Sequence, residues 1–150
     1  MAAVFQSPLR VTMLLADAAQ VVDGKLYILG GGWELCGPDP TPSALVIKID
    51  VPRDETSKPH KWELWLEDAD GRSILPPEAS PITGPFEVPT PQDPSIEYVP
   101  VPLALGFSPL PIKPGQRYTW RLYVDGRTDE LWNVSFAVRQ AAEAMPPPAQ

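Results

Sequence analysis

Proline is the residue that most limits the folds open to this chain. It occurs 21 times among 150 residues, about 14% of the chain against a usual share of about 5%. A proline inside a helix costs about 3 kcal/mol or more, because it removes a backbone donor and clashes with the preceding turn. These prolines exclude a helical bundle, a coiled coil and a Rossmann-type domain of alternating strands and long helices.

Short segments in which apolar and polar residues alternate recur along the chain, a pattern typical of β-strands. The clearest lie at 11–16, 26–30, 44–51, 61–67, 117–124 and 131–138, with weaker ones at 84–88 and 97–107. Asp-Gly pairs ending at Gly24, Gly71 and Gly126 mark turns beside these segments, and Asp-Gly between apolar runs is a strong hairpin signal. Seven to eight short strands joined by such turns predict an all-β fold, an antiparallel β-sandwich.

A more specific signature precedes the strand expected at 117–124. The pair Pro114-Gly115 forms a turn three residues before Tyr118. This is similar to the tyrosine corner of immunoglobulin-like and fibronectin-like sandwiches, in which the hydroxyl group bonds back to upstream backbone. Trp120 stands where antibody domains carry their second cysteine, and we expect Trp62 to fill the core-tryptophan role on the opposing sheet. The architecture expected is therefore immunoglobulin- or fibronectin-like, without the disulfide.

The prolines are concentrated, with twelve of them between residues 76 and 114. Pro100 and Pro102 would point the same way on one strand. Proline cannot donate to a sheet ladder, so that strand should be an edge protected against further pairing. Residues 76–95 are alternatively an extended, polyproline-like surface loop. We assign residues 1–140 to one sandwich domain and residues 141–150 to a short helical turn and a proline-rich tail.

The chain is acidic, with a formal net charge of -7 at pH 7, and no two of its twelve basic residues are adjacent. Nucleic-acid affinity depends on Lys and Arg neutralising phosphates, so we expect no nucleic-acid binding. No apolar run approaches the ~20 residues of a membrane span. The run at 11–16 is interrupted by Asp17 and is too short for a signal peptide. We expect a cytoplasmic or virion-associated protein that does not contact a membrane.

Residues suited to catalysis are sparse. His60 is the only histidine and is expected at the surface, at a loop–strand junction, and there is no Gly-x-Ser-x-Gly elbow. Cys36, the only cysteine, can form neither an internal disulfide nor a cysteine-based metal cluster, and we expect it to be buried or half-buried and unreactive. The turn at 68–71 resembles the start of a calcium loop, but Arg72 occupies a ligand position. We predict no catalytic residue, no metal and no cofactor.

The chain has five tryptophans, and their side chains cannot all face a single core. Trp65 falls on the opposite strand face from Trp62, and Tyr123 lies on the outer face of its own strand. The two predict an aromatic patch able to bind a sugar or a protein, unless the proline-rich segment covers them. Trp33 follows three glycines at 30–32, which indicates either a bend where a strand leaves the sheet or backbone approaching a ligand, with Trp33 as stacking platform.

The N-terminal part of the chain resembles the opening of a known family. Residues 13–33 read MLLADAAQVVDGKLYILGGGW, similar to small actinobacterial and phage-encoded proteins grouped as a domain of unknown function. Later parts are similar in order and spacing: 51–56, His60, 66–71 and 114–126. The resemblance implies a compact β-rich domain of bacterial or phage origin, without a signal peptide and with no catalytic residues to carry over. Segment 76–95 looks like the variable middle of that family.

These observations favour a non-enzymatic structural or interaction module that binds a protein partner or a larger assembly, for example an accessory or decoration protein of a phage particle. Stiff proline-rich segments lose little entropy when they are ordered against a partner. We therefore expect them to supply the partner-facing residues, which are Pro85, Phe86, Pro89, Pro91, Met145, Pro146, Pro147 and Pro148. The alternative is a small-ligand or carbohydrate-binding module that uses Trp65, Tyr123 or Trp33, and a hydrolase is disfavoured.

Overall fold

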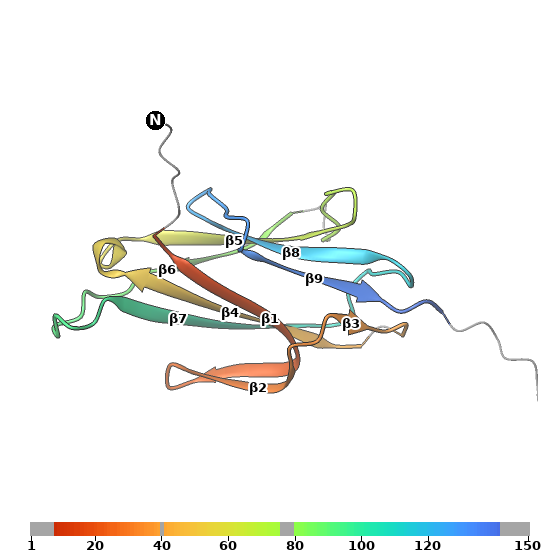
Figure 1. Ribbon diagram of the computed structural model, residues 1–150, viewed down its shortest axis with the longest axis horizontal. Coiled ribbons are helices and arrows are strands. Elements are labelled where there is room, and N and C mark those ends of the chain that lie inside the picture. Colours follow the sequence, from red (N-terminus) through yellow and green to blue (C-terminus); the bar gives the residue numbers. More distant parts are fainter. Residues whose placement is uncertain (1–7, 40, 76–79, 142–150) are drawn as a thin grey trace, which may run out of the picture.

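The computed structural model describes residues 8–39, 41–75 and 80–141, which form a two-layer β-sandwich (Figure 1). One sheet has the strand order β2-β1-β4-β7, with the bounds Lys25–Gly31, Arg10–Val22, Ser43–Pro52 and Tyr98–Phe107. The other has the order β3-β9-β8-β5-β6, with the bounds Leu35–Cys36, Asn133–Val138, Arg117–Val124, His60–Glu67 and Ile82–Phe86. All neighbours are antiparallel except β3, which runs parallel to β9.

The all-β prediction is confirmed, and the described part of the chain has nine strands rather than seven or eight. The additional strand is β3, which has two residues and is too short for an alternating pattern to reveal. A single turn of 3-10 helix, η1 (Arg53–Glu55), follows β4. Within the described residues no helix is long and apolar enough to cross a membrane. The helical turn and tail expected at 141–150 lie, apart from Ala141, outside the described residues.

The core lies between the two sheets and is built by the alternation read from the sequence. Leu45, Ile47 and Ile49 of β4 are fully buried and face β5 and β8 across the sandwich. Trp120 of β8 stacks on Phe107 of β7, with ring centroids 4.8 Å apart and planes at 20°. This contact joins the two sheets directly.

Trp62 is buried, but not on the sheet expected for it. It lies on β5, which pairs with β8, so Trp62 and Trp120 belong to the same sheet. In that pairing Trp62 stands opposite Val124, and Leu66 stands opposite Trp120. The expectation of opposing sheets is therefore wrong, because alternation reveals which face of a strand is buried but not which strands are neighbours.

The turns follow the sequence signals. In both hairpin turns two consecutive residues have left-handed backbone, with φ of 51° and 72° at Asp23 and Gly24, and 53° and 78° at Asp125 and Gly126. Two positive φ values in a two-residue turn fit the right-handed twist of the joined strands. The hydroxyl group of Tyr118 accepts a hydrogen bond from the backbone N–H of Lys113 at 2.8 Å, the upstream bond that the tyrosine-corner pattern predicts.

The proline-rich middle contains two edge strands, β6 and β7, with a loop between them. Pro100 and Pro102 lie on β7, which pairs only with β4 within the described residues, so the predicted protected edge is present. Residues 87–97 are not a strand and lie against η1. The Arg53 guanidinium donates to the carbonyl groups of Pro91 at 2.6 Å, Ile96 at 2.9 Å and Asp93 at 3.3 Å.

Residues 17–31 form a feature that we call the hairpin arm. The first half of β1 pairs with β4, but its second half, from Ala16 onward, pairs with β2. The arm bends away from the core between the sheets, and β2 lies near β7 as well as beside its partner β1 (Figure 1). A second, small core of Ala16, Ala44 and Val46 lies under it.

Candidate functional site

The chain changes sheets at the three glycines that follow Leu29. Gly32 N–H donates to the Leu15 carbonyl at 2.7 Å, and β3 then joins β9 of the other sheet. Gly30 has a φ of +62°, and the Asp17 carboxylate occupies the place that a Cβ at residue 30 would take. A side chain there would strain the backbone and displace Asp17. The backbone therefore bends here at the end of a strand, as one of the two interpretations of this segment predicted, and the approach of this backbone to a ligand stays a prediction.

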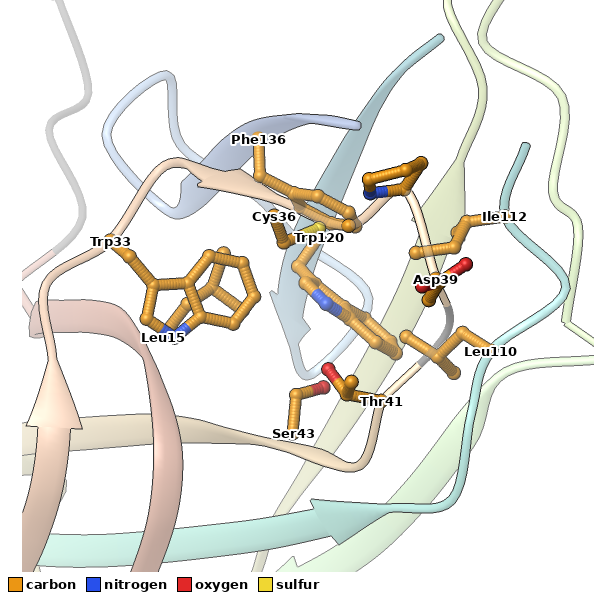
Figure 2. Close-up of a pocket in the computed structure, with 12 residues that line it drawn as sticks. Leu15, Trp33, Cys36, Asp39, Thr41, Ser43, Leu110, Ile112, Trp120 and Phe136 are labelled. Atoms are coloured by element: carbon orange, nitrogen blue, oxygen red, sulfur yellow. The ribbon is translucent and has the colours of Figure 1, made fainter. Parts of the chain in front are cut away.

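Trp33 points between the sheets rather than presenting a flat platform to solvent (Figure 2). Its ring meets Phe136 edge to face, with centroids 6.0 Å apart and planes at 84°. Its Nε1 is buried, and no acceptor within the described residues pairs with it. An unpaired buried donor costs about 1–3 kcal/mol. The unpaired indole N–H therefore costs stability at this end of the sandwich.

The sandwich is incompletely filled beside Trp33 (Figure 2). A cavity there leaves about 20 Å³ for the centre of a water-sized sphere, enough for one water molecule or one small functional group. Its inner wall is apolar and is formed by Leu15, Leu110, Ile112, Trp120 and Phe136. Its polar lining comes from the segment that leads into β4, namely Asp39, Thr41 and Ser43.

An open groove adjoins the cavity and shares Trp33 and residues 36–39 with it. The groove has a volume of about 640 Å³, and Asp17 and Arg139 also line it. The Arg139 guanidinium donates to the Gly37 carbonyl at 3.0 Å. The charged groups that line the groove are therefore two carboxylates, those of Asp17 and Asp39, and one guanidinium, that of Arg139.

Cys36 also lines both spaces, but it is not set up as a nucleophile. Burial raises the pKa of its thiol, and the positive charge of Arg139 offsets only part of that rise. A protonated thiol is a poor nucleophile and metal ligand. The half-buried position agrees with the expectation from the sequence.

His60 lies at the opposite end of the sandwich and is buried, with 6% of its surface exposed. The expectation of a surface residue is therefore wrong. Its Nδ1 lies 2.6 Å from Asp125 Oδ2 and its Nε2 lies 2.7 Å from the Glu55 carbonyl oxygen. The ring stacks on Phe86 at a centroid distance of 5.0 Å. These partners make burial tolerable, because they satisfy both ring nitrogens.

The two partners of His60 are both acceptors, so the doubly protonated imidazolium satisfies both bonds at once. Burial alone would lower the pKa of His60. The hydrogen bonds to Asp125 and to the Glu55 carbonyl, together with the negative charge of both side chains, outweigh burial and raise that pKa. Neither ring nitrogen is left to accept a proton from a substrate.

Trp65 and Tyr123 lie together on the outer face of the five-stranded sheet. The β5–β8 register sets Trp65 opposite Arg121 and Tyr123 opposite Glu63, which makes the two aromatic residues diagonal neighbours. Diagonal neighbours are within reach of aromatic side chains. Both are half-buried. The hydrogen bonds that join the proline-rich segment 87–97 to other parts of the described chain go to residues 53–57, and not to Trp65 or Tyr123.

A family model described as a family of unknown function, DUF6941, matches residues 11–139. The chain belongs to this family. No curated protein and no solved structure matches it. The match runs from β1 to β9, so the Trp33 cavity and the His60 cluster of this DUF6941 chain lie within the family domain.

The residues predicted to face a partner are placed differently from one another. Phe86 is 9% exposed and belongs to the core, so the prediction is wrong for it, because its position on β6 turns it inward against His60. Pro85 and Pro89 are exposed and Pro91 is half-buried. The remaining four lie outside the described residues, namely Met145, Pro146, Pro147 and Pro148.

Sequence reasoning missed the apolar surface of the hairpin arm. Tyr27, Ile28 and Leu29 are 52%, 41% and 71% exposed. The sequence carried a signal of this surface. Residues 26–29 are all apolar, so both faces of the strand are apolar, whereas a strand with one solvated face alternates apolar and polar residues. Asp39, Thr41 and Ser43 carried no pattern that could have assigned them to the Trp33 cavity.

Proposed function

We propose that the protein is a non-enzymatic interaction module that joins a larger protein assembly through its hairpin arm. The observation that carries this proposal is the unguarded edge of β2. Within the described residues β2 pairs only with β1, so one side of its backbone is open. Soluble proteins usually blunt such edges with proline or charge. The edge strands β7 and β6 carry prolines, whereas β2 carries only Lys25, at its start.

The side chains of the arm support the same function. Among the described residues, eight large apolar side chains are strongly exposed, and five of them lie on the arm: Val21, Val22, Tyr27, Ile28 and Leu29. The register places Val22, Tyr27 and Leu29 on one face of the hairpin and Val21 and Ile28 on the other. Exposed apolar side chains gathered on one element typically mark an interaction site. An open strand edge adds backbone hydrogen bonds to the apolar contacts, which is the basis of recognition by strand addition.

We further propose that the sandwich has an immunoglobulin-like topology. Support comes from the strand order. The series β1, β4, β7 and the series β9, β8, β5, β6 correspond to strands A-B-E and G-F-C-C′ of that fold. Tyr118 then begins the strand that carries the tyrosine corner, and Trp62 lies on the strand that carries the core tryptophan.

The assembly that we propose is a phage particle or a similar structure, with the chain as an accessory or decoration protein of bacterial or phage origin, cytoplasmic or virion-associated. The motif at residues 13–33 and the acidic charge of the chain support this assignment. A non-enzymatic role is supported by the His60 cluster, where the Glu55 carbonyl occupies the ring nitrogen that a general base would use.

The test of the arm is a substitution that spares the core. Leu29→Lys places a charge at a site that is 71% exposed, and Leu131→Lys is a matched control at 81% exposure outside the arm. We expect wild-type protein and the control to co-sediment with the assembly on a density gradient of host lysate. The fraction of Leu29→Lys that co-sediments should be at least tenfold lower. Sedimentation velocity of the purified chain distinguishes self-association. Equal retention of both variants would contradict the proposal.

A second candidate, carbohydrate binding, is favoured by the shared outer face of Trp65 and Tyr123. Sugar-dependent quenching of tryptophan fluorescence in a glycan screen would support it. Trp65→Ala should then abolish the signal, whereas Trp132→Phe, at a buried position, should retain it.

A further inference from the structure

We propose that the partner of the hairpin arm is a second copy of this chain, and that the β2 strands of the two copies pair antiparallel across a two-fold axis. The inference rests on the proposed function, because it takes the arm as the interaction surface and names what the arm binds. Three features carry it: the open backbone groups of β2, the side chains that the pairing sets opposite one another, and the prolines on other sheet edges.

The backbone of β2 offers its open edge to a partner at two residues. The two positive-φ residues of the Asp-Gly turn make Val22 and Lys25 a hydrogen-bonded pair. Such pairs alternate along an antiparallel ladder, which directs the N–H and C=O groups of Leu26 and Ile28 away from β1. The regular ladder ends at Gly30, where φ is +62°. All of β2 except Leu26 is exposed, so a partner strand can reach both open residues.

Symmetry then fixes the register of the pairing. A two-fold axis normal to a sheet keeps every side chain on its own face, and neighbouring residues lie on opposite faces, so the pair must be centred on a residue. Centring it on Tyr27 sets Leu26 of each copy opposite Ile28 of the other, and both open residues of both copies then form backbone hydrogen bonds. Centring it on Ile28 would set Leu26 opposite Gly30, beyond the regular ladder, and leave Leu26 without a partner.

The same register matches the exposed side chains. Tyr27 of each copy faces Tyr27 of the other in a closely spaced, non-hydrogen-bonded pair. Its ring can lie in the other copy's groove of about 410 Å³, which Tyr27 and Leu29 line together with Ala18 and Ala19. Lys25 lies opposite Leu29 and can cover it with its apolar stem. Lys25 is the only charged residue of β2, so the register opposes no like charges.

The other sheet edges limit this association to two copies. Pairing through β2 joins two four-stranded sheets into one, whose outer edges are both β7 (Figure 1). Pro100 and Pro102 lie on β7, Pro85 lies on β6, and β3 has two residues. Prolines guard an edge against strand addition, so among the described edges β2 is the one suited to self-pairing. Each copy covers the open edge of the other, which gives a closed two-fold dimer.

Sedimentation velocity of the purified chain over a range of concentrations tests the pairing. We expect a monomer–dimer equilibrium in which Leu29→Lys raises the dimer Kd at least tenfold, because its ammonium group lies opposite Lys25 of the other copy. Leu131→Lys, at an exposed site outside the arm, should leave the Kd unchanged. Adding Lys25→Glu to Leu29→Lys should restore most of the affinity, because opposite charges then face each other between the copies.

A cysteine reports the register directly. In a Cys36→Ser background, Tyr27→Cys should form a disulfide between two copies under mild oxidation. The reason is that residues in a non-hydrogen-bonded pair have Cα atoms about 4.5 Å apart, which is within the range of a disulfide. Leu131→Cys in the same background is the control and should remain unlinked.

The outcomes separate this proposal from the proposed function. A monomer at every concentration, or a dimer that neither weakens with Leu29→Lys nor cross-links through residue 27, overturns the self-pairing of β2. If Leu29→Lys is still lost from the assembly on the density gradient, the arm binds a different protein and the proposed function stands. A dimer that behaves as expected, beside equal retention of Leu29→Lys and Leu131→Lys in the assembly, would contradict the proposed function alone.

Discussion

At the end of the sandwich that holds His60, buried polar groups are paired with one another; at the end that holds Trp33, a buried donor and two carboxylates are unpaired. The closed end consists of η1, the start of β5 and the Asp125 turn, and the open end consists of β3 and the Trp33 cavity. Hydrogen bonds among His60, Asp125 and Glu55 join three separate segments at the closed end. At the open end Arg139 is bonded to the Gly37 carbonyl, but within the described residues the side chains of Trp33, Asp17 and Asp39 have no hydrogen-bond partner.

The difference has a physical consequence for where stability and binding reside. A buried polar group that is fully paired contributes to stability, whereas an unpaired one costs stability until something binds to it. We therefore expect the closed end to hold the fold together. The open end leaves a buried donor and two exposed carboxylates unpaired, so we expect it to contribute less to stability.

The largest expected effect on the free energy of unfolding comes from replacing one aromatic residue at each end. Phe86→Ala removes a buried ring that packs on His60, and should lower the free energy of unfolding by about 3–5 kcal/mol. Trp33→Phe keeps an aromatic ring and removes the unpaired donor, so it should cost less than about 1.5 kcal/mol. Urea unfolding of both variants measures the difference. Equal losses would mean that the two ends contribute alike.

Arg53 provides the next effect, at the closed end. Arg53→Met keeps most of the apolar stem but removes hydrogen bonds to three carbonyl groups of the 91–96 segment. We expect a loss of about 1–2 kcal/mol, because these bonds involve a charged but exposed donor. Amide exchange should accelerate at Ile96, whose N–H bonds to the Asp93 carbonyl.

The control for this substitution is Lys58→Met. Lys58 is exposed and reaches Glu55 only at 3.9 Å, so its removal should leave both measurements unchanged within about 0.5 kcal/mol. Unaltered exchange at Ile96 in Arg53→Met would show that the proline-rich segment is held by other contacts.

The strands and turns could be predicted because their causes are local. Alternation in β4, β5 and β8 reports which face of each strand is buried, and the Asp-Gly pairs at 23–24 and 125–126 report backbone that has to be left-handed. Tyr118 was predictable for the same reason, since its partner Lys113 is five residues away.

The polar interior could not be predicted because its causes are distant in sequence. His60 is buried only because Asp125, 65 residues later, completes its hydrogen bonds. Trp33 was a candidate from its glycines, but its orientation depends on Phe136 of β9. The course of the hairpin arm depends on the small residues Ala16 and Ala44, which let β2 pack beneath the sheet, and small residues carry no periodic signal.

The pH dependence of stability isolates the closed end. The pKa of His60 is raised in the folded state, so its contribution is complete below the unfolded value of about 6.5 and is lost as the pH rises through the folded value. We expect the free energy of unfolding to fall by about 1 kcal/mol across that range, a modest figure because the Asp125 side chain is 47% exposed. Denaturation in urea at a series of pH values measures it.

Two controls assign this dependence to His60. His60→Gln should remove it, and Asp125→Asn should reduce it by removing the charged partner. As the only histidine, His60 gives a single set of imidazole NMR signals, so its own titration can be followed directly. A midpoint below the value of an unfolded peptide would contradict the assigned direction.

The smallest effect is kinetic and belongs to the open end. Burial raises the pKa of Cys36, so its alkylation by iodoacetamide at pH 7 should be slower than that of a cysteine in an unstructured peptide. Arg139 opposes that rise, so Arg139→Gln should move the midpoint of the pH–rate profile to a higher pH. The full profile is needed because Arg139 also holds the Gly37 carbonyl, and its loss could expose the thiol. Greater exposure would raise the plateau rate, whereas loss of the charge shifts the midpoint. A midpoint that does not move would show that the charge of Arg139 is screened from the Cys36 thiol.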